Sequence, residues 1–144
     1  MHLTLQLIIL LSYLFQTQLR ITTKDENFKS RFNVGYIKEG DGKTFPNNGD
    51  LATIHYHGTY TQSGKPFDSS IERGDTFGFI VGQNQVILCW EQVIKMMSKN
   101  ERIKIDCPYD LAYGEKGVID VIPEKADLTF DIELLEVSKA KDDL

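Results

Sequence analysis

The most restrictive feature of this chain is an alternation of apolar residues in the segment 126–137, strict from Leu128 to Leu134. Leu128, Phe130, Ile132 and Leu134 occupy every second position, so in an extended strand they share one face. A helix would scatter these side chains around its axis, and a slip of one residue in register would turn Phe130 into water. The segment is therefore predicted to be a β-strand with one buried and one solvated face.

Similar alternation, or a short apolar run between glycines, predicts the remaining strands. From residue 86 to 97, apolar residues instead recur at spacings of three and four, which is typical of a helix that buries one face. These patterns predict an α+β domain of about five antiparallel strands, with the apolar face of the sheet against one short helix. The predicted elements are strands at 33–38, 51–61, 76–81, 102–107 and 126–137, the helix at 86–97, turns at 40–50 and 62–65, and a loop at 108–123.

Length and charge narrow the classes of function. The 144 residues are enough for one domain with a core, and 16 Lys and Arg against 21 Asp and Glu leave a net charge of -5. Nucleic acid requires a basic face, so no nucleic-acid partner is expected. His55 and His57 share a strand face, but the sequence offers no third ligand, so neither a metal nor a cofactor is expected.

The first residues differ from the rest of the chain. Residues 1–19 contain no Asp, Glu, Lys or Arg, and residues 3–15 are strongly apolar. Because crossing a bilayer takes about 20 apolar residues, this run fits the core of a secretory signal peptide better than a stable membrane span. Cleavage is expected between Phe15 and Ile21. A buried N-terminal helix or strand and a short signal anchor are the alternatives.

The sequence KDDL at 141–144 resembles the KDEL retrieval signal, the alternative being an acidic tail without such a role. With the apolar leader, it predicts the endoplasmic reticulum lumen or secretion. Cys89 and Cys107 could pair in that oxidising compartment, but both lie in apolar patterns and are interpreted as small core residues. The expected organisation is a signal peptide at 1–20, a polar segment at 21–32, one domain at 33–138 and an acidic tail at 139–144.

A series of sequence blocks between about Val34 and Val137 resembles the FKBP-type peptidyl-prolyl cis-trans isomerases. No single block is decisive, but their order and spacing together are specific. The resemblance implies a strongly bent antiparallel sheet wrapped around a short helix, with a shallow apolar pocket for a prolyl ring between them. The blocks are GDGKTFPNNGD, HYHGTY, GKPFDSS, FGFIVGQNQVI, the helix around Trp90, DLAYGEKG, Ile122-Pro123 and LTFDIELLEV.

The resemblance also implies which residues form that pocket. Trp90 would be its floor and Tyr56, Phe77 and Phe130 its aromatic walls, while Phe79 is expected in the core. The residues expected to act in catalysis are Tyr56, Asp68, Trp90, Tyr113 and Phe130. The residues expected to bind substrate or macrolide are Tyr56, Phe67, Asp68, Arg73, Phe77, Val86, Ile87, Trp90, Tyr113, Val121, Ile122 and Phe130.

Within this set, Tyr113 and the backbone N–H of Ile87 are expected to donate hydrogen bonds to carbonyls of the bound chain. Asp68, bonded to Tyr56, would accept a ligand hydroxyl. Rotation about an X-Pro bond has a barrier of about 18–20 kcal/mol, and the twisted amide is less dipolar than the planar one. A dry aromatic pocket with placed donors therefore suits this reaction without a nucleophile or a metal.

The implied partners are proline-containing polypeptides and the macrolides tacrolimus and rapamycin, bound by a monomer. The alternative function is a chaperone-like peptide-binding module with negligible turnover. Two departures from the family pattern bear on drug affinity and substrate preference more than on the fold. Cys89 replaces the small residue often found before the family tryptophan, and Ile119-Asp120, after Val118, stands where many members have Pro-Gly.

Overall fold

The computed structural model describes residues 10–12, 14 and 26–140, and the chain divides into two compact units, residues 1–32 and 33–144. In the first unit, residues 10–12, 14 and 26–32 are helical. Most of the predicted signal peptide and all of the KDDL sequence lie outside the described residues. Within the described part, no helix is both long and apolar enough to cross a bilayer.

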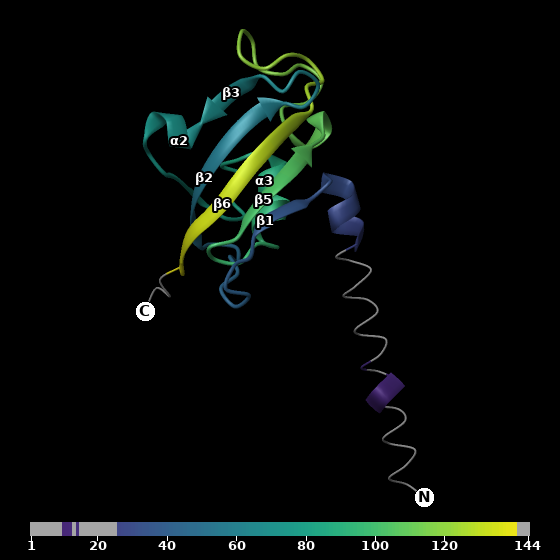
Figure 1. Ribbon diagram of the computed structural model, residues 1–144, viewed down its shortest axis with the longest axis vertical. Helices are drawn as coiled ribbons and strands as arrows, with labels where there is room; N and C mark the ends of the chain where they lie inside the picture. Colours follow the sequence, from purple (N-terminus) through teal and green to yellow (C-terminus); the bar gives the residue numbers. More distant parts are fainter. Residues whose placement is uncertain (1–9, 13, 15–25, 141–144) are drawn as a thin grey trace, which may run out of the picture. The chain divides into compact units, whose positions relative to one another are not determined.

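The second unit is built on one antiparallel six-stranded sheet, shown in Figure 1. The strand order is β1-β5-β6-β2-β3, and β4 pairs with β2 beyond the end of β3. This sheet confirms the predicted antiparallel α+β fold. The strands are β1 (Gly35–Lys38), β2 (Leu51–Tyr60), β3 (Pro66–Ser69), β4 (Phe77–Ile80), β5 (Arg102–Cys107) and β6 (Leu128–Ser138).

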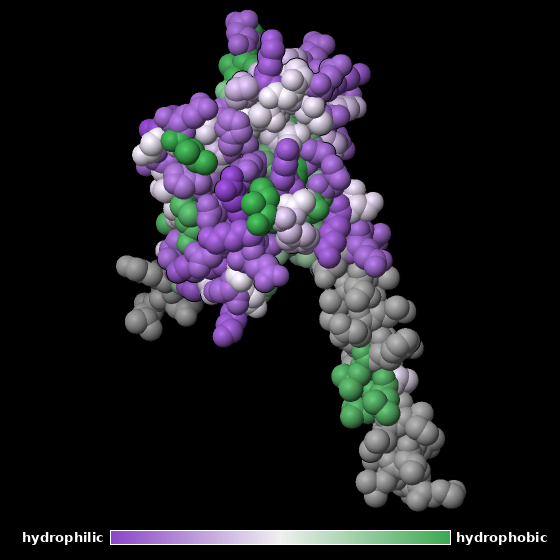
Figure 2. Space-filling model, viewed as in Figure 1, coloured by the Kyte–Doolittle hydropathy of each residue, from purple (hydrophilic) through white to green (hydrophobic). Residues whose placement is uncertain are grey.

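Strand β6 lies in the middle of the sheet, between β5 and β2. Leu128, Phe130, Ile132 and Leu134 are all buried, as their alternation predicts. A bulge at Leu135 then shifts the pairing with β2 by one residue and makes Val137 the next buried position. The face turned to the viewer in Figure 2 is largely hydrophilic, with isolated apolar side chains.

Helix α3 (Leu88–Ile94) lies against the sheet behind β6 in Figure 1 and is shorter than the predicted 86–97. It begins later because Ile87 is extended, with φ -60° and ψ 150°. It ends earlier because the amide of Met97 bonds to the carbonyl of Ile94, three residues back. Trp90 and Ile94 are buried on its sheet-facing side.

Two short elements between β2 and β4 were not predicted. Strand β3 follows the predicted turn at 62–65, and helix α2 (Ser70–Arg73) follows β3 directly. The Ser69 hydroxyl accepts a hydrogen bond from the Glu72 amide at 3.3 Å, and Gly74 ends the helix at φ 70°. This helical turn returns the chain so that β4 pairs with the same edge of β2 as β3 does.

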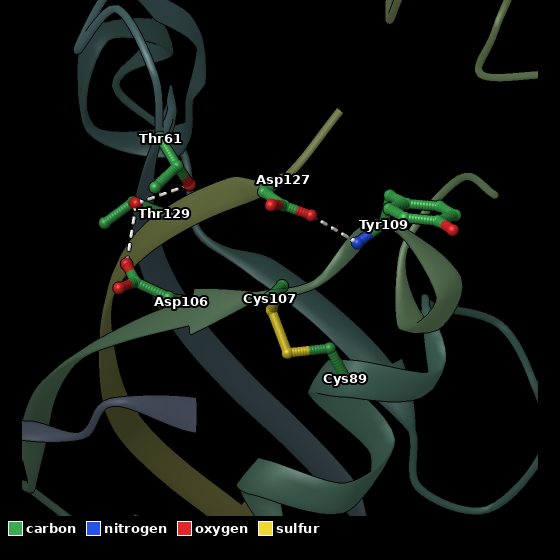
Figure 3. Close-up of a disulfide and its surroundings, with 7 residues drawn as sticks. All are labelled: Thr61, Cys89, Asp106, Cys107, Tyr109, Asp127 and Thr129. Carbon is green, nitrogen blue, oxygen red and sulfur yellow. Dashed lines mark hydrogen bonds between the residues drawn. A yellow bond between two sulfur atoms is a disulfide. The ribbon is translucent and has the colours of Figure 1, made fainter. Parts of the chain in front are cut away.

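Cys89 and Cys107 form a disulfide, shown in Figure 3, with Cα atoms 5.8 Å apart. The interpretation as two separate core thiols is therefore wrong, although both residues are fully buried as expected. Apolar periodicity reports burial only, and it says nothing of which buried residues meet across two elements. The bond ties the first turn of α3 to the end of β5, beside the short 3-10 helix η1 (Tyr109–Leu111).

The end of β6 is fixed by a buried carboxylate, Asp50. Its Oδ1 accepts a hydrogen bond from the Ala140 amide at 3.0 Å, and its Oδ2 accepts from the Asn47 amide at 2.8 Å. The ammonium of Lys139 also donates to Oδ2, at 3.0 Å. Led by the Asn47 amide, these donors hold the pKa of Asp50 below its ordinary value, although burial opposes them.

Candidate active site

The sheet, α3 and two adjoining segments line a partly open cavity of about 130 Å³. Its wall is mostly aromatic and aliphatic, and only a few polar groups reach it. This composition is typical of a site that binds an apolar group in a fixed orientation. The lining residues are Tyr56, Phe67, Asp68, Phe77, Gln85, Val86, Ile87, Trp90, Tyr113 and Phe130.

The indole of Trp90, on α3, is the centre of the ring cluster. Its centroid lies 4.9 Å from that of Tyr56, 5.1 Å from Phe130 and 6.0 Å from Phe77, all edge to face. Phe79, predicted to be core, is buried against the indole at 6.4 Å and against Phe77 at 6.1 Å, and it does not line the cavity. The edge-to-face packing fixes the orientation of each ring, so the cavity is formed before a ligand arrives.

Gly58, near the end of β2, leaves space for the rings of Phe67 and Phe130 beside the strand. A Cβ at this position would lie 2.7 Å from Cζ of Phe67 and 2.9 Å from Cε1 of Phe130. Those distances are shorter than real Cβ contacts, so any side chain would push a ring from its place. The glycine of the HYHGTY block is therefore needed for the shape of the cavity.

A polar group closes one side of the cavity. The hydroxyl of Tyr56 donates to Oδ2 of Asp68 at 2.5 Å, and Nη2 of Arg73 donates to the same hydroxyl at 2.9 Å. Arg73 also forms an ion pair with Asp68, and its guanidinium lies 5.6 Å from the centroid of the Tyr56 ring. Burial, assisted by the Asp68 carboxylate, raises the pKa of Tyr56 above 10.0, while Arg73 opposes the shift.

Two further groups can donate hydrogen bonds to a ligand. The half-buried phenol of Tyr113 lines the cavity, and burial followed by the Asp68 charge raises its pKa above 10.0. It therefore keeps its proton at neutral pH. Ile87 lines the same cavity, and its backbone N–H donates no hydrogen bond within residues 26–140, so it is available to a bound carbonyl.

Three residues expected in the pocket lie outside its lining. Arg73 lies behind Asp68, with half of its side chain exposed. Val121 and Ile122 belong to a hairpin at residues 116–122, here called the flap, which is closed by a bridge between Val118 and Ile122. Within this hairpin, Ile122 is buried at the base and Val121 is 59% exposed at the tip.

The flap tip is a tight turn over residues 118–121. The amide of Val121 bonds to the carbonyl of Val118 at 3.0 Å, and Asp120 at the third position has φ 61°. A left-handed conformation at that position suits Gly best and Asp or Asn next. Where many family members have Pro-Gly, Ile119-Asp120 therefore still forms a closed turn.

Gln85 lines the cavity and was not predicted. Its side-chain oxygen accepts a hydrogen bond from the amide of Ile80 at 2.9 Å, which holds the segment before α3 against the end of β4. Its only signal in the sequence is its place directly before Val86 and Ile87.

The two histidines of β2 do not form a metal site with other described residues. Nδ1 of His55 lies 3.0 Å from the hydroxyl of Ser70, within hydrogen-bonding distance. In the described part of the chain, no group of three or more His, Cys, Asp or Glu side chains could hold a metal ion. His55 thus contributes to the junction between β2 and α2.

With this geometry established, comparisons with known proteins identify related chains. The model of one protein family, described as FKBP-type peptidyl-prolyl cis-trans isomerase, matches residues 42–135. The FK506-binding protein 1 of Debaryomyces hansenii is 49% identical over 105 residues, which cover 73% of this chain and 93% of that protein. The peptidyl-prolyl cis-trans isomerase FKBP1A of Xenopus laevis is 46% identical over 104 residues, covering 72% and 95%.

A solved structure shows the same fold. The crystal structure of FkpA from Escherichia coli superposes with a TM-score of 0.67 at 36% sequence identity. The match covers 74% of this chain and 48% of that one, so this chain spans about half the length of FkpA.

Proposed function

This chain belongs to the family of FKBP-type peptidyl-prolyl cis-trans isomerases, and from that premise we propose that it rotates X-Pro bonds in the cavity around Trp90. The observation that carries the proposal is the ring cluster: Tyr56, Phe77 and Phe130 stand edge-on to one indole and enclose a cavity of about 130 Å³. A prolyl ring is apolar and compact, so it matches the chemistry of this wall.

The environment acts on the amide that precedes the bound proline. A planar amide has a larger dipole than a twisted one, so water stabilises the ground state more than the transition state. Transfer into the aromatic cavity removes part of that solvation and lowers the barrier. Every tenfold acceleration requires about 1.4 kcal/mol of such differential stabilisation.

The polar groups orient the chain around the bond. Tyr113 and Ile87 both line the cavity, which supports a role for the phenol and the backbone N–H in binding substrate carbonyls beside the prolyl ring. The Tyr56 phenol is already engaged by Asp68 and Arg73, which fixes its ring against Trp90. Tyr113 is thus the tyrosine that binds the substrate, and Tyr56 is the one that holds the cavity wall in place.

The test is isomerase activity of the purified chain on a proline-containing tetrapeptide in a protease-coupled assay. Trp90→Leu and Phe130→Tyr should each reduce kcat/KM about tenfold or more, because one removes the central ring and the other places a hydroxyl in the cavity wall. Phe45→Leu is the matched control, since Phe45 is partly exposed and does not line the cavity. Absence of catalysis by the unaltered chain, or full activity in both cavity variants, would refute the proposal.

We also propose that the cavity binds tacrolimus and rapamycin. Several relatives are named FK506-binding proteins, and FK506 is tacrolimus. Trp90 is the only tryptophan, so its fluorescence reports directly on occupation of the cavity. Saturable quenching by tacrolimus, lost in Phe130→Tyr, is expected, and an unchanged emission spectrum at high tacrolimus concentration would contradict macrolide binding.

The second candidate function is a chaperone-like module that holds apolar segments of clients without turnover. The side chain of Ile119, at the flap tip, is 87% exposed and offers such a segment a contact outside the cavity. Suppression of aggregation that persists in Trp90→Leu, with no isomerase activity in the unaltered chain, would favour this function.

For location, we propose the endoplasmic reticulum lumen or secretion, with the domain at 33–138 following a cleaved leader at 1–20. Three features support it: the uncharged apolar stretch at 3–15, the KDEL-like sequence at 141–144, and the buried Cys89–Cys107 disulfide, since disulfides persist in oxidising compartments. A tagged chain should stay in the reticulum, and removal of residues 143–144 should send it into the medium. An uncut leader would contradict the cleaved signal peptide, and an unchanged location after removal of residues 143–144 would contradict retrieval.

A further inference from the structure

The flap has a single polar connection to the sheet. Its hairpin is closed by its own backbone, through the bonds between Val118 and Ile122. Among the hydrogen bonds within residues 26–140, only one joins residues 118–121 to a residue outside the flap: the hydroxyl of Tyr60 donates to the carbonyl of Val121 at 2.8 Å. Within the described residues, Tyr60 therefore provides the one hydrogen bond that ties the flap tip to the sheet.

Tyr60 is itself held firmly. It is the last residue of β2, where its amide bonds to the carbonyl of Lys65 at 2.9 Å and its carbonyl accepts from the amide of Gly64 at 2.8 Å. Both bonds belong to the hairpin turn between β2 and β3. The hydroxyl therefore extends from a rigid point of the sheet.

The Tyr60 ring also contacts the wall of the cavity. Its centroid lies 5.2 Å from that of Phe67, and Phe67 packs edge to face on Phe130 at 5.7 Å. Phe67 and Phe130 both line the cavity, whereas Tyr60 does not. One residue thus joins the flap tip, through its hydroxyl, to the cavity wall, through its ring.

We propose that Tyr60 is a positioning residue, which holds the apolar flap tip beside the cavity and so sets the affinity for the bound polypeptide. This inference rests on the proposed function at the same cavity. The tip carries Ile119, 87% exposed, and Val121, 59% exposed, two apolar side chains that can cover the part of a substrate that extends beyond its prolyl ring. Tyr60 does not line the prolyl pocket, so its hydroxyl acts on the flap and not on the rotating bond.

The expected kinetic signature follows from that placement. A flap that covers the flanking chain contacts the planar and the twisted amide equally, so it contributes uniform binding. Loss of uniform binding raises KM and leaves kcat unchanged. A defect in the ring cluster would instead lower kcat, because that cluster acts on the amide itself.

The test compares Tyr60→Phe with Tyr109→Phe in the full chain. Tyr60→Phe removes the hydroxyl and keeps the ring on Phe67, whereas the Tyr109 hydroxyl makes no hydrogen bond within residues 26–140 and serves as the matched control. For a proline tetrapeptide, Tyr60→Phe should raise KM about two- to tenfold, the effect of one neutral hydrogen bond, with kcat unchanged. Its backbone order parameters at 118–122 should fall from about 0.85 towards 0.6. Tyr109→Phe should change neither quantity.

Several outcomes separate the claims. If Tyr60→Phe has the KM and the order parameters of the unaltered chain, the positioning role is wrong. If kcat falls while KM stays constant, Tyr60 supports the ring cluster and not the flap, which also overturns the inference. If the unaltered chain shows no isomerase activity, the proposed function fails, and the order parameters alone then decide whether Tyr60 holds the flap.

Discussion

The disulfide between Cys89 and Cys107 gives a stability prediction whose size follows from the structure. The two residues are 18 positions apart in the chain, so the bond closes a loop of that length in the unfolded state. Loop-closure entropy for such a loop amounts to about 3 kcal/mol at 25 °C. Reduction should therefore lower the free energy of unfolding by about that amount.

The assay is urea unfolding followed by the fluorescence of the single tryptophan, with and without dithiothreitol. For a domain of this size, a loss of about 3 kcal/mol lowers the urea midpoint by about 1 to 3 M. Both sulfurs are fully buried, so samples must reach equilibrium in urea, where unfolding exposes the bond to the reductant. The double variant Cys89→Ala/Cys107→Ala is the control, and dithiothreitol should not move its midpoint.

Two results would refute the reasoning. Equal midpoints in both conditions, with thiol titration showing complete reduction, would mean that the cross-link does not constrain the unfolded chain. Two titratable thiols in protein purified without reductant would mean that the bond is not formed.

Three other perturbations test the site and its support. Because burial raises the pKa of Tyr113 above 10.0, kcat/KM should be flat from about pH 6 to about pH 9, and a decline there that disappears in Tyr113→Phe would contradict the assigned protonation state. Gly58→Ala should reduce kcat/KM about tenfold or more and destabilise the fold by about 1–3 kcal/mol, whereas Gly35→Ala, with its nearest contact at 3.9 Å, should do neither. The folded-state pKa of Asp50 is below its unfolded value, so its contribution to stability is complete above about pH 4 and is lost as the pH falls further. Urea midpoints at about pH 7 and about pH 3 should therefore differ less in Asp50→Asn than in the unaltered chain, and equal differences in both would count against this linkage.

The regular elements were predictable because they bury one face. The period of two in β6 and the spacing of three and four around Trp90 record directly which side chains avoid water, and both patterns agree with the buried positions. Phe79 was expected in the core because it alternates with Phe77 in the same strand, and it is buried. The antiparallel α+β fold and the FKBP family follow from such patterns and from the order of the sequence blocks.

What escaped prediction depends on contacts between elements. Strand β3 has only four residues and is bounded by a turn and a helix, so no periodicity accumulates in it. The disulfide joins a helix and a strand whose relative placement no local pattern records. The same is true of Gln85, which reaches the cavity by bonding to the amide of Ile80, and of Tyr60, whose hydroxyl finds a carbonyl 61 positions away.

The central place of β6 also has a consequence for the biosynthesis of this protein. Strands β2 and β5 each pair with β6 over most of their lengths, yet β6 is the last of the six to be made. Until residues 128–138 have been translated, the strand that lies between β2 and β5 is missing, and the edges of β2 and β5 that pair with it have no partner. Pairs such as β2–β4 and β1–β5 can form earlier, but the two halves of the sheet can join only when synthesis of this domain is nearly finished.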